Sequence, residues 1–212
     1  MKRKALMPVL LVLVFALTRI PGLMPPNFSA AYAFLFCAGV YFTGRAGWWV
    51  PLTVMAVTDL GLCAYYQWFK GIDAFQPHLL VPYIGYAGLI WLGRRFKPEA
   101  SFLSLLGGGV LGAFLFYLIT NTAAWFFNPF GNPEYTKDFA GWLIALTKGT
   151  AGYPTTLEFF RNTLTSGGLF TGLFVGAMKL GEAMEKEEEA ESEEEEAGEP
   201  EAGEAEPEEA PA

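Results

Sequence analysis

The sequence predicts an all-α integral membrane protein: a bundle of six transmembrane helices followed by a disordered acidic tail. The chain is 52% hydrophobic and 16% aromatic but only 17% charged, a balance typical of membrane proteins. Its net charge of −8 arises from the C-terminal end, because residues 182–212 hold 16 acidic residues and one basic residue. Residues 1–181 hold 13 basic and 6 acidic residues. A basic, apolar domain over 1–181 is therefore expected to carry an acidic tail over 182–212.

The apolar runs of the domain have lengths close to those of membrane-crossing helices. The six predicted spans cover about residues 5–19, 28–43, 48–66, 78–96, 101–127 and 155–180. The first run follows the basic stretch Met1–Lys4, which is also how a signal peptide begins. Five further apolar segments follow it, which favours an uncleaved first span. Three prolines between residues 19 and 27 predict a stiff, extended first loop.

Two segments of the chain are not expected to cross the membrane. Residues 128–154 form the longest loop, and its middle part has apolar residues at helical spacing, from Phe139 to Leu146. This pattern predicts an interfacial helix at about residues 138–148. The tail is built almost entirely of Glu, Ala, Gly and Pro, a composition that predicts disorder. Its role as a solubilising segment or as an electrostatic site for a partner is left open.

The distribution of basic residues predicts the orientation in the membrane. With six spans, nine Lys and Arg residues lie on the side of the two termini and five lie on the opposite side. Because basic residues accumulate in cytoplasmic loops, both termini are expected in the cytoplasm of a multi-pass inner (plasma) membrane protein surrounded by lipid.

Most polar residues within the spans then fall in the outer half of the membrane. A polar cavity with an aromatic rim, open to the outside, would give a small solute a place to bind. The predicted solute-binding residues are Arg19, Asn27, Tyr83, Asn121, Trp125, Arg161 and Asn162.

Asp59 is an isolated carboxylate within the third span, with no other charged residue in the ten positions on either side. A lone Asp at membrane depth costs about 3 kcal/mol on insertion scales unless it is paired. An ion pair with Arg19 or Arg161 would satisfy it, as a structural tie or as a charge that positions an arginine behind the pocket. Glu158 is expected to play a similar supporting role.

Other functional classes receive no support from the sequence. The chain lacks the Gly-x-Ser-x-Gly and His-Glu-x-x-His motifs and has no paired aspartates in facing spans, so we do not expect an enzyme. The single His78, and two cysteines without metal-binding spacing, predict no metal site and no cofactor. No basic face for nucleic acid is found outside the membrane flanks. A scaffolding membrane protein that acts through partner contacts remains the alternative function.

Several short segments resemble a family of bacterial six-helix membrane proteins assigned to transport. They include Asn27–Ala30, Thr58–Leu60, Thr120–Trp125 and Leu157–Leu164. That family is similar to the substrate-binding (S) components of energy-coupling factor transporters, which capture vitamins or other micronutrients outside the cell. The resemblance implies a solute-binding bundle that works with a transmembrane coupling protein and ATPase subunits. The first span departs from it, because it lacks the two alanines four residues apart that many S components place against the coupling protein.

Overall fold

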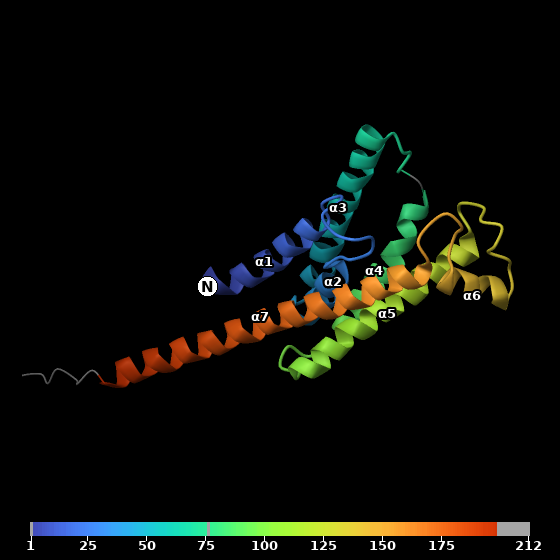
Figure 1. The fold of residues 1–212 in the computed structure, drawn as a ribbon. Coiled ribbons are helices and arrows are strands. Elements are labelled where there is room, and N and C mark those ends of the chain that lie inside the picture. Colours follow the sequence, from blue (N-terminus) through green and yellow to red (C-terminus); the bar gives the residue numbers. More distant parts are fainter. Residues whose placement is uncertain (1, 76, 199–212) are drawn as a thin grey trace, which may run out of the picture.

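The computed structural model describes residues 2–75 and 77–198, and within these residues the fold is all-helical with no strand (Figure 1). The all-α prediction is confirmed. The helices are α1 (Lys2–Thr18), α2 (Ala31–Tyr41), α3 (Ala46–Lys70), the short 3-10 helix η1 (Pro77–Leu80), α4 (Val81–Gly93), α5 (Phe102–Phe127), α6 (Phe139–Thr147) and α7 (Thr156–Gly198). α6 matches the predicted interfacial segment to within one residue at each end.

α2 is the central helix of the bundle, and ten consecutive residues, Ala31–Val40, are buried. It packs against α1, α3, α4, α5 and α7, which explains why its sequence is apolar on every face. The Phe34 ring, for example, stacks on Phe15 of α1 with 4.9 Å between centroids. The helix is shorter than the predicted span of residues 28–43, because residues 28–30 and 42–43 belong to the flanking loops.

Two glycines allow the backbones of α2 and α4 to touch. A Cβ atom built on Gly39 of α2 would lie 2.3 Å from the Ile90 carbonyl oxygen, and one built on Gly93 of α4 would lie 2.2 Å from the Phe36 carbonyl oxygen. Neither distance can be accommodated without moving a helix backbone. The two positions therefore fix the spacing of α2 and α4, as small residues do between packed membrane helices.

α5 and α7 form the longest helix pair, and Figure 1 shows α7 running the length of the molecule beside α5. Small residues again mark the contact. Gly109 of α5 is in close contact with the Thr171 side chain of α7, and Gly167 of α7 is in close contact with the Ala113 side chain of α5. α3 packs on α2 and α4. Its C-terminal end projects away from α5 and α7 (Figure 1).

Two of the described helices, α3 and α5, are long and apolar enough to cross a membrane. Their outward faces carry large apolar side chains, with Trp49, Val57 and Trp68 of α3 and Leu103 of α5 all more than half exposed. The apolar parts of α1, α2 and α4 are shorter than the membrane-crossing length.

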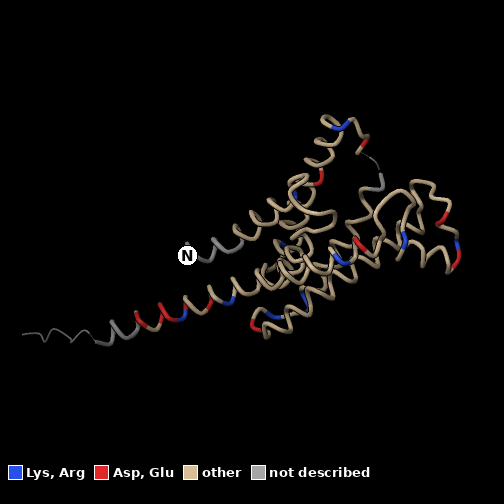
Figure 2. The backbone as a smooth tube through the Cα atoms, viewed as in Figure 1, with Lys and Arg blue, Asp and Glu red and all other residues tan. Residues whose placement is uncertain are grey.

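The C-terminal part of the chain differs from the prediction. α7 continues through the acidic segment to Gly198, so residues 182–198 are helical and not disordered. Glu, Lys and Ala are good helix formers, and extending an existing helix avoids the cost of nucleating a new one. Glu182 also precedes Lys186 at the favourable four-residue spacing. Figure 2 shows acidic residues following one another along this end of α7. Residues 199–212 of the predicted tail lie outside the described residues.

Candidate functional site

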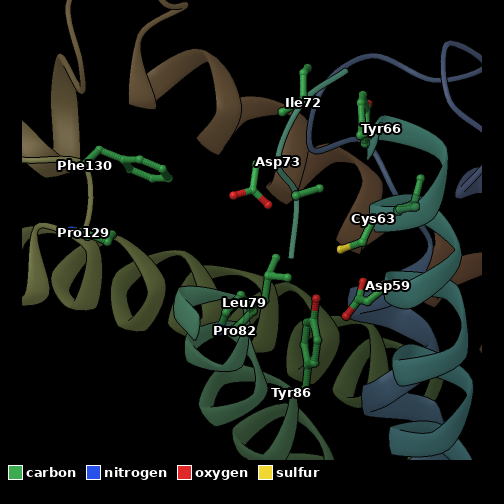
Figure 3. A pocket seen from close by; sticks show the side chains of 12 residues that line it. Asp59, Cys63, Tyr66, Ile72, Asp73, Leu79, Pro82, Tyr86, Pro129 and Phe130 are labelled. Carbon is green, nitrogen blue, oxygen red and sulfur yellow. The ribbon is translucent and has the colours of Figure 1, made fainter. Parts of the chain in front are cut away.

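A cavity of about 650 Å³ lies between the C-terminal half of α3, the loop after it, the start of α4 and the segment after α5 (Figure 3). Its lining is mainly apolar with a few polar side chains. The lining residues are Asp59, Leu62, Cys63, Tyr66, Ile72, Asp73, Ala74, Leu79, Pro82, Tyr86, Pro129 and Phe130.

Two residues with left-handed backbone conformation, one after α3 and one after α5, direct the following loops to this cavity. α3 ends at Lys70 and is capped by Gly71, which has φ +63°. The N–H of the next residue, Ile72, donates to the Tyr66 carbonyl at 3.1 Å. This C-terminal cap reverses the chain and places Asp73 over the cavity. α5 is followed by Asn128, which has φ +42° and whose N–H donates to the Ala124 carbonyl at 2.9 Å. The Asn128 side chain then holds the next turn through Asn132, whose N–H donates to Asn128 Oδ1 at 2.7 Å.

The polar groups of the wall come from both sides of the cavity. Asp59 and Cys63 lie one helical turn apart on α3, Tyr86 faces them from α4, and Asp73 enters from the loop (Figure 3). The Tyr86 side chain is only 7% exposed, and its hydroxyl points into the cavity. No hydrogen bond to this hydroxyl is found within the described part of the chain.

Asp59 forms the ion pair that the sequence predicted, and its partner is Arg19. Arg19 Nη2 donates to Asp59 Oδ1, with side-chain exposures of 17% and 22%. The contact ties the end of α1 to α3, and the Phe15 ring lies 6.0 Å from the Arg19 guanidinium carbon. Arg161, the other proposed partner, is exposed on α7.

The structure places Asp59 and its predicted neighbours differently with respect to this cavity. Asp59 was expected behind the pocket, yet it lines the cavity. Arg19, predicted to bind solute, pairs with Asp59 and is not one of the residues that line this cavity. Tyr83 is not among the lining residues either; it packs against the core, and its ring lies 5.1 Å from the Tyr86 ring between centroids. Asp59 thus contacts Arg19 through its Oδ1 atom and is also one of the residues that line the cavity.

Asn121 and Trp125 lie near the C-terminal end of α5 but outside this cavity. The Asn121 amide donates to the Tyr117 carbonyl at 2.8 Å and lines a separate cavity of about 390 Å³. The Trp125 indole N–H donates to the Thr136 carbonyl at 2.6 Å, and Lys137 Nζ lies 5.5 Å from the Trp125 ring centroid. Trp125 therefore fastens the long loop to α5.

The same loop is stabilised by the N-terminal cap of α6. The Asp138 carboxylate accepts a hydrogen bond from the Gly141 N–H at 2.7 Å and another from the Thr136 hydroxyl. These two hydrogen bonds hold the pKa of the Asp138 carboxyl below its usual value.

The remaining predicted residues secure the first loop and the start of α7. Asn162 Nδ2 donates to the Pro26 carbonyl at 2.9 Å, and the Asn27 carbonyl accepts from the Tyr32 hydroxyl at 3.3 Å. Glu158 accepts from the Thr155 N–H at 2.8 Å, while the Thr155 hydroxyl accepts from the Glu158 N–H at 3.3 Å. This reciprocal pair is a capping box. None of the seven residues predicted to bind solute lines the 650 Å³ cavity.

Sequence reasoning missed the cavity residues Cys63, Asp73, Tyr86 and Phe130 as a group. One signal was present in the sequence. Asp73 is the only acidic residue between the third and fourth predicted spans, and it lies in the loop that follows the span containing Asp59. The described residues contain no group of three His, Cys, Asp or Glu side chains that could hold a metal ion.

A family model described as a family of unknown function (DUF6580) matches residues 1–189. No curated protein and no solved structure matches the chain.

Proposed function

The chain belongs to the DUF6580 family, and we propose that it is a multi-pass membrane protein that binds a small solute in the cavity beside Asp59. The observation that carries this proposal is a charged side chain that faces open volume. A pair that served only to tie α1 to α3 would be enclosed by packing, whereas Asp59 is paired to Arg19 on one side and lines the cavity on the other. Charges at membrane depth are costly and mark functional sites by default.

The proposed topology has six spans formed by α1, α2, α3, α4, α5 and the first part of α7, with α6 at the interface. Two of these helices have the length and composition to cross a membrane unaided. The nine-to-five distribution of basic residues supports cytoplasmic termini in the inner membrane. In that orientation the end of α3, the start of α4 and the end of α5 all lie on the outer side. The cavity formed by these three ends would therefore open outward.

The size and lining of the cavity suit a small organic solute. Ligand pockets commonly measure about 300–1,000 Å³ and are mostly apolar with a few converging polar groups, and the cavity of about 650 Å³ fits both criteria. A protein of this kind performs no covalent chemistry. The resemblance to S components supports a role in solute capture, with a coupling protein and its ATPase subunits as the energising partners.

Filling the cavity should abolish solute binding. Ala74 lines the cavity from the loop, so Ala74→Trp adds an indole to it without altering a helix. We expect mass spectrometry of small molecules released from the purified full-length protein to detect a solute with the wild type and not with Ala74→Trp.

The matched control is Ala140→Trp, which adds the same indole to an exposed position of α6. This variant should retain the solute. Removal of residues 182–212 should also leave it bound, whereas a scaffold that acts through the acidic segment would lose its function on that deletion. A solute retained equally by Ala74→Trp and by the wild type would contradict the proposal.

A further inference from the structure

The turn before α3 and the turn after α4 form a basic surface, made of Arg45, Arg94, Arg95 and Lys97, at the other end of these helices from the solute cavity. We propose that this basic surface, together with a cavity beside it, binds the phosphate head group of an anionic phospholipid in the cytoplasmic leaflet. The inference goes beyond the proposed solute site. It rests on the topology proposed above, which puts both turns on the cytoplasmic side.

The fold brings the two turns into direct contact. Arg94 Nη1 donates to the Gly44 carbonyl at 3.2 Å, across 50 positions of the sequence. Gly47 leaves room for this guanidinium, because a Cβ atom built on Gly47 would lie 2.8 Å from Arg94 Nη1. The Arg94 and Arg45 side chains are both exposed. Two arginines from separate loops therefore share one surface at this end of the bundle.

The charge of this surface is strongly positive. Residues 43–47 and 94–101 hold the four basic residues and one acidic residue, Glu99, and Figure 2 shows basic residues with an acidic one beside them in the loop that leads into α5. In the described part of the chain, no carboxylate forms an ion pair with any of the four. Basic surfaces and pockets on the cytoplasmic side of membrane helices attract the head groups of anionic lipids.

The cavity beside the basic surface explains why a lipid fits better than a free phosphate. It measures about 370 Å³, and the described residues that line it are Arg45, Trp48, Trp49 and Leu52. Their spacing places all four on one face of α3. Trp48 and Leu52 pack against the core, whereas Trp49 is 69% exposed.

Each part of this cavity matches a part of a phospholipid. A guanidinium group binds phosphate through two parallel hydrogen bonds. Indole rings suit the boundary between head groups and acyl chains, because they are apolar with one polar N–H group. The Arg45 side chain can thus hold the phosphate while the glycerol and the start of an acyl chain cover Trp48, Trp49 and Leu52. A free phosphate would leave these apolar side chains uncovered.

Lipid selectivity of the purified full-length protein tests the proposal. Native mass spectrometry in a non-ionic detergent can compare dioleoylphosphatidylglycerol with dioleoylphosphatidylcholine, which have the same acyl chains. A basic residue at a membrane surface contributes about fivefold to the binding of an anionic lipid. We expect a preference for phosphatidylglycerol of about tenfold or more, and no displacement by a large excess of glycerol 3-phosphate. Displacement by glycerol 3-phosphate would show a site for a soluble phosphate and would overturn the lipid assignment.

Arg45→Gln should lower this preference by about fivefold. Arg45 makes no side-chain cap to α3, so its loss should leave thermal unfolding unchanged. Arg161→Gln is the matched control, because it removes an exposed arginine of α7 and should keep the preference. Ala74→Trp should also keep it, so the solute proposal and this inference fail in different variants. Equal retention of the two lipids by the wild type, or an equal loss of preference in Arg45→Gln and Arg161→Gln, would overturn the inference.

Photo-labelling of the wild-type protein locates the lipid without any substitution. A phosphatidylglycerol with a diazirine near the start of one acyl chain should label residues 46–52 more than the matching phosphatidylcholine does. Peptide mass after digestion identifies the labelled segment. Equal labelling of residues 46–52 by the two lipids would contradict a head-group site at Arg45.

Discussion

Asp59→Leu is expected to destabilise the folded protein by about 2–3 kcal/mol, because it leaves the Arg19 guanidinium without its counter-charge in a largely buried position. The Arg19 side chain is 17% exposed, and its Nε atom already lacks a hydrogen-bond partner within the described residues. Removal of one member of a fully buried pair costs about 3–5 kcal/mol, and the partial exposure reduces that figure. The change can be measured as a loss of thermal stability in detergent solution.

The double variant Arg19→Leu/Asp59→Leu should recover most of this loss, since replacing both partners of a buried pair by apolar residues is often neutral. Arg161→Leu is the matched control, because it removes an arginine that is exposed on α7 and should leave stability unchanged. Equal destabilisation by the single and double variants would show that the pair does not form. The double variant, although stable, should lose the solute.

Gly39→Ala is expected to destabilise the bundle although alanine is the better helix former. An unhindered Gly-to-Ala change within a helix gains up to about 1 kcal/mol. At Gly39 the new Cβ would lie 2.3 Å from the backbone oxygen of Ile90, so α2 and α4 must separate. Overpacking of this kind costs about 1–3 kcal/mol, and here the obstacle is a backbone that cannot rotate away. The expected result is a lower unfolding temperature and a lower yield of folded protein.

Gly107→Ala is the control for this change. Gly107 also lies within a helix, and a Cβ atom built there would meet nothing within 4 Å. This variant should be neutral or slightly more stable. If Gly39→Ala were as stable as Gly107→Ala, the close approach of α2 and α4 would be wrong.

The helices could largely be predicted because long apolar runs between glycine, proline and basic turns leave few alternatives. α5 and α6 match their predicted ranges to within one residue. The ends were less predictable where packing decides them. α2 is shorter than its apolar run because its flanks form turns, and α7 continues past its apolar part because the acidic residues that follow are good helix formers.

The site could be predicted only in part. The isolation of Asp59 in the sequence required a partner, and Arg19 is that partner. The rest of the cavity depends on turns whose direction cannot be read from composition. Gly71 folds Asp73 back over α3, and Asn128 brings Phe130 to the same place from α5. The sequence predicts solute binding by Asn121, Trp125 and Asn162 from their polarity alone. In the structure their side chains donate hydrogen bonds to backbone carbonyls.

The central claim is that a solute reaches the cavity beside Asp59 from outside the cell, and the two native cysteines test it directly. Cys63 lines the cavity, whereas Cys37 is fully buried in α2. Intact cells that produce the full-length protein can be treated with the membrane-impermeant 2-(trimethylammonium)ethyl methanethiosulfonate, and each cysteine can then be followed by peptide mass. The account predicts modification of Cys63 in intact cells, no modification of Cys37, and loss of Cys63 modification in Ala74→Trp. Modification of Cys63 only after the cells are opened would contradict it.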